Sequence, residues 1–308
     1  MQYYVLAMYI MGMIEINEHS GFADLLVSLI LSAKMEWKRK KNRMENDMDV
    51  YTGFAGVYDT FMDNIPYEEW SRYVEGLLKE HNVQDGLVVD MGCGTGKITE
   101  LLALKGYDMI GIDNSEEMLS IAREKLMEYE EKDPRKSILY LLQDMREMEL
   151  YGTVRAAVSI CDSMNYILED EELLEVFRLV NNYLDEKGIF IFDLNTEYKY
   201  REILGDRNIC ENRDDASFIW ENYYYPEQAI NEYDLTIYVQ EEDDHFLRME
   251  ETHYQRAYSL ERVKELLLQA GMEFVVAYDA FTKEPPKADS ERIYVITREG
   301  HQDKKLYK

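Results

Sequence analysis

The stretch VVDMGCGTGKIT, residues 88–99, constrains the fold more than any other part of this chain. An apolar run that is typical of a buried strand leads directly into a turn with three glycines in five residues, and a helical pattern follows. A glycine-rich turn between a strand and a helix brings the backbone close to a ligand, because no Cβ atom stands in the way. The stretch therefore predicts the first βα unit of a ligand-binding α/β domain.

From about residue 67 onward, strand-like and helical segments alternate, and this alternation predicts a doubly wound α/β fold with a parallel sheet. The predicted strands of this seven-stranded, Rossmann-like sheet are residues 87–91, 107–113, 137–144, 155–162, 188–195, 273–281 and 292–299. Between the fifth and sixth of these, three further strand-like segments predict an inserted antiparallel β layer: residues 217–225, 229–240 and 246–258. We expect its turns at Pro226 and at Asp243-Asp244.

These patterns divide the chain into five parts. We expect an N-terminal extension, a core with an N-terminal lid, a β cap, the end of the core and a polar tail, over residues 1–43, 44–200, 201–258, 259–298 and 299–308. The extension contains two apolar runs of about a dozen residues each, short of the roughly 20 that span a bilayer, so we expect no integral membrane segment. Three interpretations of it are open: a helix that docks on the body or on a partner, a peripheral membrane contact, or no role, with translation starting at Met44.

The charge balance narrows the class of partner. Asp and Glu number 62 against 34 Lys and Arg, which gives a formal net charge of −28. Binding of nucleic acid depends on Lys and Arg at the phosphates, so we expect no nucleic-acid partner and a neutral or cationic ligand. Cys93, Cys161 and Cys210 lie far apart, with no histidine at metal-ligand spacing. This predicts neither a disulfide framework nor a metal site, and it favours a cytoplasmic location.

The spacing of the glycines limits the ligand. Gly92, Gly94 and Gly96 follow a G-x-G-x-G pattern, whereas a dinucleotide fingerprint reads G-x-G-x-x-G and a P-loop ends in Gly-Lys-Ser or Gly-Lys-Thr. Acidic residues precede the turn and end the next two strands, at Asp90, Asp113 and Asp144. With these features, residues 51–298 resemble the class I S-adenosylmethionine-dependent methyltransferases, of the methyltransferase domain 25 type. That resemblance implies S-adenosylmethionine as the cofactor.

The resemblance, together with the chemistry of this cofactor, assigns roles near the turn. A bare turn lets the methionine part of the cofactor lie against the backbone, and Asp113 would accept hydrogen bonds from the ribose hydroxyls. By resemblance, Asp144 and the Met145 backbone meet the adenine, and Met118 either packs on the ring or belongs to the core. The predicted cofactor-binding residues are Tyr51, Asp90, Gly92, Cys93, Gly94, Thr95, Gly96, Asp113, Asn114, Met118, Asp144, Met145 and Cys161.

Two segments indicate the class of methyl acceptor, again by resemblance. Residues 51–70 are similar to a lid of small-molecule members of this family, including bacterial enzymes that dimethylate amino sugars on nucleotide carriers, and residues 248–272 are similar to the end of their β insertion. This likeness implies that Tyr51 and Tyr58 cover the cofactor and that the β insert covers the acceptor. We expect in-line transfer of a methyl group to nitrogen or oxygen of a small molecule. Alignment and exclusion of water matter most in such a transfer, and a base is optional.

The end of the fourth strand, CDSMNYI at residues 161–167, supplies side chains that could orient the acceptor. The predicted catalytic residues are Tyr58, Asp162 and Asn165, and the further candidates are Tyr166, Asn195, His253 and Arg256. Polar groups at strand ends also cap helices, and that alternative is open for each of them. His245, at the tip of an expected hairpin, is predicted to lie in solvent.

Other motifs are absent. The chain has neither the D/N/S-P-P-Y/F/W signature of amino-methyltransferases that act on nucleic-acid bases nor the Pro-Cys of C5-cytosine enzymes. Five arginines either hold a phosphate or carboxylate or balance nearby acidic side chains: Arg201, Arg207, Arg213, Arg248 and Arg256. Two other functions are open at this point, an NAD-dependent oxidoreductase on a similar sheet and a methyltransferase-like fold that serves as a non-catalytic binding module.

Overall fold

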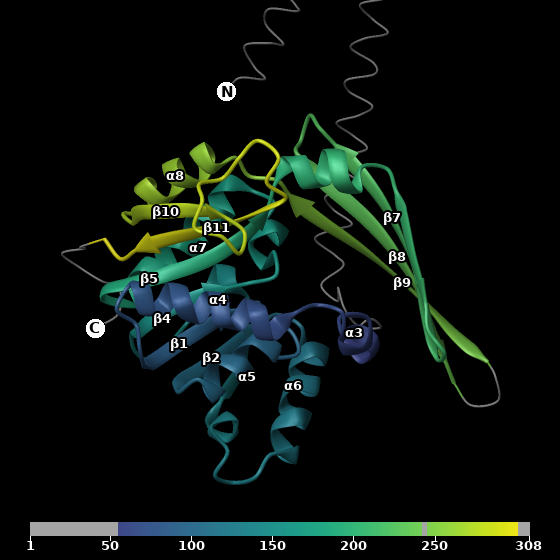
Figure 1. Ribbon diagram of the computed structural model, residues 1–308, viewed down its shortest axis with the longest axis horizontal. Coiled ribbons are helices and arrows are strands. Elements are labelled where there is room, and N and C mark those ends of the chain that lie inside the picture. The colour runs from purple at the N-terminus through teal and green to yellow at the C-terminus, as the bar shows by residue number, and fades with distance from the viewer. Residues whose placement is uncertain (1–54, 242–244, 301–308) are drawn as a thin grey trace, which may run out of the picture. The chain divides into compact units, whose positions relative to one another are not determined.

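The computed structural model describes residues 55–241 and 245–300 (Figure 1). The predictions for the N-terminal extension, for Tyr51 and for the turn at Asp243-Asp244 lie outside the described residues. In the described ranges, none of the helices combines the length and the apolar character that crossing a membrane requires.

The predicted seven-stranded sheet is confirmed. Its strands are β1 (Gly86–Met91), β2 (Tyr107–Asp113), β3 (Leu139–Leu142), β4 (Val154–Ser159), β5 (Leu184–Asn195), β10 (Glu273–Asp279) and β11 (Arg292–Arg298). They lie in the order β10-β11-β5-β4-β1-β2-β3, and all pairs are parallel except those that β11 makes with β5 and β10. The order of the strands reverses between β1 and β4, and ligands of such sheets bind at the carboxyl ends of the strands near that point.

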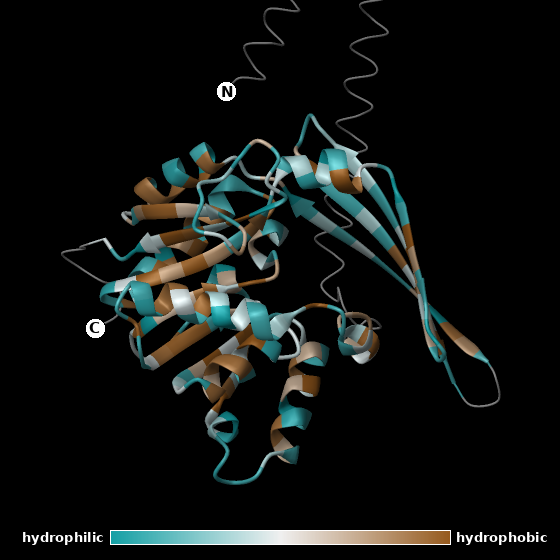
Figure 2. Cartoon of the chain, in the orientation of Figure 1, coloured by the Kyte–Doolittle hydropathy of each residue, from teal (hydrophilic) through white to brown (hydrophobic). Residues whose placement is uncertain are grey.

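Helices cover both faces of this sheet (Figure 1). One face packs against α4 (Tyr67–Glu80), α5 (Lys97–Leu104) and α6 (Glu116–Glu128), and the other against α7 (Asp170–Tyr183) and α8 (Leu260–Gln269). Alternate strand residues serve the two layers: Val88 packs with the first set of helices and Val89 with the second. Figure 2 accordingly shows strands β1, β4 and β5 as mainly apolar, as expected for strands buried on both faces.

The inserted antiparallel layer is also confirmed, as a separate sheet of four strands. They are β6 (Asn208–Asn212), β7 (Ala216–Tyr225), β8 (Ile230–Gln240) and β9 (Phe246–Arg256), paired in that order after a π-helical turn, η4 (Lys199–Leu204). The turn at Pro226 is present, with Ala229 N donating to Pro226 O at 3.3 Å. The sequence analysis missed β6, because NICEN is short and mostly polar and carries no alternation of its own.

The lid helix α3 (Ala55–Phe61) packs on this insert. Val57 and Phe61 share a small apolar cluster with Phe218, Leu235 and Ile237, and the rings of Phe61 and Phe218 meet edge to face with their centroids 4.9 Å apart. Just after the helix, both oxygens of Asp63 accept hydrogen bonds from Arg213 on the insert, at 2.7 and 2.8 Å. The lid and the insert therefore form one continuous layer.

A strand boundary differs from the one that the sequence predicts. The third strand is shorter than residues 137–144, because Pro134–Ser137 forms a 3₁₀ turn, η1, with Asp133 accepting from Arg135 N at 2.9 Å. The first two residues of the predicted polar tail, Glu299 and Gly300, have contacts with the core. Glu299 N donates to Gly188 O at 2.9 Å, and Gly300 N donates to the Asn181 side chain at 3.1 Å, so both residues pack on the core.

Candidate active site

The glycine turn joins β1 to α5 at the carboxyl edge of the sheet, and all three of its predicted glycines have positive φ angles. At Gly92, with φ +72°, a Cβ atom would lie 2.6 Å from the Ser163 hydroxyl, so a side chain does not fit there. At Gly94, with φ +53°, a Cβ atom would have no neighbour within 4 Å. The turn therefore packs closely against the protein at Gly92. At Gly94 it is open, and its backbone can face a ligand there.

Asp113, at the end of β2, is bound to the same turn. Its carboxylate accepts hydrogen bonds from Gly94 N at 2.7 Å and from Ser115 N at 2.9 Å, one at each oxygen. Burial raises the pKa of Asp113, and the backbone N–H groups of Ser115, Gly94 and Asn114 oppose that rise. Ser115 caps α6 as predicted, with its hydroxyl accepting from Met118 N at 3.2 Å. Asp113 thus fixes the tip of the second strand against the open side of the glycine turn.

Asp90 lies behind the turn, with 2% of its surface exposed. Its carboxylate accepts a hydrogen bond from the Thr99 hydroxyl at 2.6 Å. Burial raises the pKa of Asp90 to about 7, the hydrogen bond from Thr99 opposes the rise, and the charge of Asp113 adds to it. Asp90 is therefore a buried carboxyl group whose charge is easily lost in the free protein.

The lid helix is attached to the glycine turn by a side chain that the sequence analysis did not single out. Asp59 on α3 accepts a hydrogen bond from the Thr95 hydroxyl at 2.6 Å, and its other oxygen pairs with Lys125 on α6 at 2.8 Å. Thr95 is 2% exposed. No motif marks Asp59 in the sequence, because its partners stand 36 and 66 residues away.

At the end of β3, Asp144 turns toward Arg146. Its carboxylate caps the 3₁₀ turn η2 (Met145–Glu147), accepting from Arg146 N at 2.8 Å, and pairs with the Arg146 guanidinium at 2.6 Å. Burial acts to raise the pKa of Asp144, but the hydrogen bonds from Arg146 outweigh it and the net shift is downward. Met118 is 2% exposed, and the thioether methyl of Met145 would lie 3.4 Å from a Cβ atom at Gly92.

The edge after β4 begins with two residues of positive φ, Cys161 and Asp162. The buried Asp193 on β5 holds this backbone by accepting from Cys161 N at 3.2 Å and from Asp162 N at 2.7 Å. Non-glycine residues in this conformation cluster at functional sites. Burial raises the pKa of the Cys161 thiol, and the negative charge of Asp193 adds to that shift, so Cys161 remains a neutral thiol.

Asp162 and Asp193 share one arginine. Arg292 on β11 pairs with Asp162 at 2.6 Å and with Asp193 at 2.5 Å. The second Asp162 oxygen accepts from the Gln255 side chain of β9 at 2.6 Å, and Gln255 in turn accepts from the Tyr200 hydroxyl at 2.9 Å. Asp162 therefore links the core to the insert, and no sequence signal identified Arg292 or Gln255 as its partners.

Asn165 does not lie open to a substrate, contrary to its predicted role in orienting the acceptor. Its side chain is fully buried, donates to the carbonyl oxygens of Asn195 and Arg256, and accepts from Asn195 N. All three partners are backbone groups, so Asn165 joins η3 (Ser163–Tyr166) to β5 and to the end of β9. Asn195 is itself 3% exposed and accepts from the Lys199 ammonium at 2.9 Å.

The predicted lid tyrosine, Tyr58, is half-buried on α3 and forms a hydrogen bond with Tyr67 at the start of α4. Burial raises the pKa of Tyr67, and the nearby Cys161 and Asp162 add to that shift. The structure thus brings Tyr58 and Tyr67 to the edge that follows β4. Tyr67 was missed because it reads as an ordinary position of an amphipathic helix.

The candidates from the insert separate into two groups. His253 is 2% exposed and lies 3.3 Å from the Tyr166 hydroxyl. Arg256 turns away, donating to Leu168 O at 2.8 Å and pairing with Asp170 at 3.2 Å. His245 is exposed, as predicted.

The five arginines of the sequence analysis are explained by their own surroundings. Arg201, Arg213, Arg248 and Arg256 each form an ion pair with a neighbouring carboxylate. Arg207 donates to the carbonyl oxygen of Glu202. The interpretation that they balance nearby acidic side chains therefore accounts for Arg201, Arg213, Arg248 and Arg256 without a bound anion.

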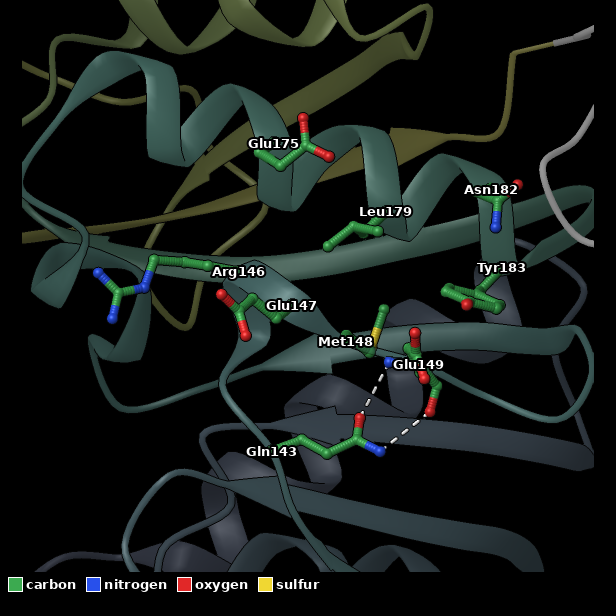
Figure 3. Close-up of a pocket in the computed structure, with 9 residues that line it drawn as sticks. All are labelled: Gln143, Arg146, Glu147, Met148, Glu149, Glu175, Leu179, Asn182 and Tyr183. Atoms are coloured by element: carbon green, nitrogen blue, oxygen red, sulfur yellow. Dashed lines mark hydrogen bonds between the residues drawn. The ribbon is translucent and has the colours of Figure 1, made fainter.

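A surface groove of about 720 Å³ lies elsewhere, between η2 and α7 (Figure 3). Gln143 lines its lower side and makes two 3.0 Å hydrogen bonds with the Glu149 backbone, drawn as dashed lines in Figure 3. Leu179 and Tyr183 of α7 face it from the other side. None of the predicted site residues lines this groove, although Gln143 and Arg146 flank Asp144 and Met145 in the chain.

The residues around the glycine turn fit S-adenosylmethionine. The turn offers open backbone at Gly94, and the Asp113 carboxylate beside it can accept further hydrogen bonds from hydroxyls. Across residues 55–241 and 245–300, no group of three or more His, Cys, Asp or Glu side chains is placed to hold a metal ion.

Comparison with known proteins decides the family. A methyltransferase domain family matches residues 88–188. A putative methyltransferase of Bacillus subtilis, YqeM, is 35% identical over 246 residues, which cover 80% of this chain and 95% of that protein. This chain belongs to the methyltransferase family. A second relative, a putative methyltransferase of Geobacillus, is 32% identical over 249 residues, or 80% of this chain and 99% of that protein.

Solved structures agree with this assignment. The methyltransferase superposes on an S-adenosylmethionine-dependent methyltransferase of Clostridium acetobutylicum with a TM-score of 0.71 and 27% identity, over 82% of this chain and 99% of that one. DesVI of Streptomyces venezuelae has the same fold, with a TM-score of 0.64 and 18% identity over 81% of this chain and 99% of its own. The predicted family, fold and enzyme class are confirmed, and S-adenosylmethionine is the methyl donor of this family.

Proposed function

We propose that this methyltransferase moves a methyl group from S-adenosylmethionine to a nitrogen or oxygen atom of a small molecule, which binds between the lid helix, η3 and the insert. The observation that carries the proposal is the meeting of these elements at one edge. Thr95 of the glycine turn binds Asp59 of the lid, and Asp162 binds Gln255 of the insert. A methyl group presented at this edge would be covered by protein, which excludes the water that competes with an acceptor.

The proposed cofactor contacts follow the order of the strands. The open backbone around Gly94 would bind the methionine part, with Asp90, Gly92, Cys93, Thr95 and Gly96 shaping the turn. Asp113 and Asn114 would bind the ribose, and Met118, Asp144 and Met145 would border the adenine. The Asp144 carboxylate already binds Arg146, so we assign the adenine contact to the backbone that Asp144 caps. Cys161 would line the methyl group, and Tyr51 is kept as a proposed lid contact.

The proposed acceptor contacts are fewer. Tyr58 and Asp162 lie where the lid and the fourth strand meet, and Asp162 shares the single charge of Arg292 with Asp193. The Asp162 carboxylate would accept a hydrogen bond from the methyl acceptor. The full burial of Asn165 favours a supporting role one step from the acceptor. In-line displacement with this alignment needs no metal ion.

The net charge of −28 supports an acceptor other than nucleic acid, and the widely spaced cysteines support a cytoplasmic location, as proposed from the sequence. A surface of this sign repels nucleic-acid phosphates, attracts cationic solutes and does not repel neutral ones. The division into core, β cap and closing core over residues 44–200, 201–258 and 259–298 is part of the same proposal, because it sets the cap above the acceptor.

Two measurements test the proposed function. Calorimetry with S-adenosylhomocysteine and with NAD should give tight binding of the first alone, and the reverse result would favour an oxidoreductase. Incubation with S-adenosylmethionine labelled in its methyl group and a fractionated cell extract should label the small-molecule fraction. Label in the nucleic-acid or protein fraction would contradict the proposed acceptor class, and cofactor binding without any label would favour a non-catalytic module.

A further inference from the structure

A chain of polar side chains connects the insert to the edge that follows β4. On β9, the Nε2 atom of the buried His253 lies 3.2 Å from a carboxylate oxygen of Glu251. The Nδ1 atom of His253 lies 3.3 Å from the hydroxyl oxygen of Tyr166, the last residue of η3. That hydroxyl also lies 2.5 Å from the hydroxyl of Tyr233 on β8. We refer to Glu251, His253 and Tyr166 as the relay.

The partners of His253 fix its tautomer. A carboxylate only accepts hydrogen bonds, so the ring proton of the neutral imidazole belongs on Nε2, where it is donated to Glu251. The Nδ1 atom then carries a lone pair that faces the Tyr166 hydroxyl. A carboxylate that orients an imidazole, which in turn faces a hydroxyl, is the arrangement by which proteins activate a hydroxyl group.

The ring of His253 is held in place from a second side. Tyr233 is its cross-strand neighbour on β8, and the two rings stack with their centroids 4.9 Å apart and their planes 15° from parallel. Trp220 of β7 packs against the other side of Tyr233 with a centroid distance of 4.8 Å. The imidazole is therefore locked in one orientation by packing as well as by hydrogen bonds.

The relay ends on the short turn η3, which also contacts the glycine turn. Tyr166 closes the short turn η3, and Ser163 at the start of the same turn donates to Gly92 O at 3.2 Å. Asp162, just before η3, accepts from Gln255, two residues from His253 on β9. One turn of four residues thus connects the cofactor turn to the histidine.

We propose that Tyr166 is a catalytic residue that takes a proton from the methylated atom of the acceptor, and that His253, oriented by Glu251, receives the proton of the tyrosine. The inference rests on the proposed function and narrows its acceptor class to protic groups, namely primary or secondary amines or hydroxyls. Tertiary amines and thioethers have no proton to give and fall outside it.

The step balances as follows for an amine. The nitrogen lone pair forms the bond to the methyl carbon while the carbon–sulfur bond breaks and leaves its electron pair on sulfur, which gives S-adenosylhomocysteine. The proton of the nitrogen moves to the Tyr166 oxygen as the hydroxyl proton of Tyr166 moves to His253 Nδ1. The resulting imidazolium is balanced by the Glu251 carboxylate.

The other groups around the relay are consistent with this direction of proton flow. Burial raises the pKa of Tyr233, and the hydrogen bond with Tyr166 opposes that rise. The charges of Asp162 and Glu251 raise the pKa further. Tyr233 therefore keeps its proton and can donate a hydrogen bond to the Tyr166 oxygen. Arg256, which follows on β9, donates to Leu168 O and pairs with Asp170 instead. Glu251, Tyr166 and Tyr233 are thus titratable groups that contact His253.

The kinetic test uses the full chain, methyl-labelled S-adenosylmethionine and the small-molecule extract fraction that the wild-type protein labels. His253→Gln and Tyr166→Phe should each lower the rate at neutral pH by about 100-fold or more, the usual contribution of a positioned base. The dependence of the rate on pH should differ between the wild type and His253→Gln, because only the wild type has the proposed proton acceptor. His245→Gln, at the exposed histidine, is the matched control and should keep the wild-type profile. A normal pH profile in His253→Gln overturns the proposal.

Two further readouts separate a catalytic role from a structural one. Both variants should bind S-adenosylhomocysteine with the wild-type affinity and unfold at a similar temperature, whereas loss of both properties together with activity would reduce the relay to packing. Nitrogen-15 NMR of the imidazole rings should show His253 with its proton on Nε2, and Glu251→Gln should weaken that preference. A proton on Nδ1 would overturn the relay, whether or not an extract fraction is labelled. The absence of any labelled fraction would, by itself, count only against the proposed function.

Discussion

The cofactor side and the acceptor side of the carboxyl edge are formed by different kinds of contact. On the cofactor side, the backbone supplies most of the contacts: Asp113 binds the N–H groups of Gly94 and Ser115, and the positive φ angles of the glycines shape the turn. On the acceptor side, the contacts join groups from distant parts of the chain, and several of them are between two side chains. Asp162 binds Gln255 and Arg292, which stand 93 and 130 residues further on.

This difference explains why one half appears in the sequence as a motif and the other does not. A backbone-built site needs particular residues at fixed short spacing, because only glycine adopts such turns freely. A side-chain-built site needs pairs whose spacing depends on the whole topology, and many pairs satisfy the same geometry. The same contrast predicts that methyltransferases of this family differ in their methyl acceptors through changes on the acceptor side of the carboxyl edge.

The largest expected effect is on the acceptor half, at Arg292. Replacing it in Arg292→Leu leaves the fully buried Asp193 without its charged partner, and we expect a loss of about 3 to 5 kcal/mol in the free energy of unfolding, measured with urea. Arg201→Leu is the matched control, because Arg201 pairs with Glu197 on the exposed surface and should change stability little. Equal effects in the two variants would mean that the backbone N–H groups of Cys161 and Asp162 are enough to stabilise Asp193 without Arg292.

The second effect is a dependence of the free energy of unfolding on pH, caused by Asp90 on the cofactor half. Burial raises the pKa of Asp90 to about 7 from about 4 in the unfolded chain, so the folded protein holds a proton that the unfolded chain releases. Ionised Asp90 therefore destabilises the fold, and the stability advantage of Asp90→Asn should grow as the pH rises from about 4 to about 7, by on the order of 3 kcal/mol. Urea unfolding across this range measures it. Parallel stability curves for the two proteins would show that Asp90 stays ionised.

The third effect tests whether the backbone-built half depends on one carboxylate. Asp113→Ala should weaken binding of S-adenosylhomocysteine by about 1.5 to 3 kcal/mol in calorimetry, because it removes a charged hydrogen-bond acceptor and also frees the Gly94 and Ser115 N–H groups. Asp108→Ala is the control, on the exposed surface of the same strand. If both variants bind as the wild type does, the ribose lies elsewhere and the comparison of the two halves loses its main support.

The sequence predicted most of the fold because its signals were local. The strand at residues 107–113 and the N-cap at Ser115 agree with the structure residue for residue, since alternation and capping depend on near neighbours. The short polar strand β6 has no such signal. At the site, Gly94 and Asp113 are joined by a hydrogen bond, and both stand out in the sequence through local patterns. The burial of Asn165 depends in part on β9, 91 residues further along the chain, and no local pattern reveals it. Asp59 and Gln255 were missed for the same reason.

The smallest expected effect concerns the helix that joins the two halves. Asp59 attaches the lid to the cofactor turn through the buried Thr95 hydroxyl, and Asp63 attaches it to the insert through Arg213. Asp59→Ala should weaken binding of S-adenosylhomocysteine by about 1 kcal/mol, roughly fivefold, because the Thr95 hydroxyl loses its partner. Asp63→Ala should leave that affinity unchanged and raise the KM of the acceptor fraction instead. Equal losses of cofactor affinity in both variants would mean that the lid, the turn and the insert respond as one unit. In that case α3 would belong to both the cofactor side and the acceptor side.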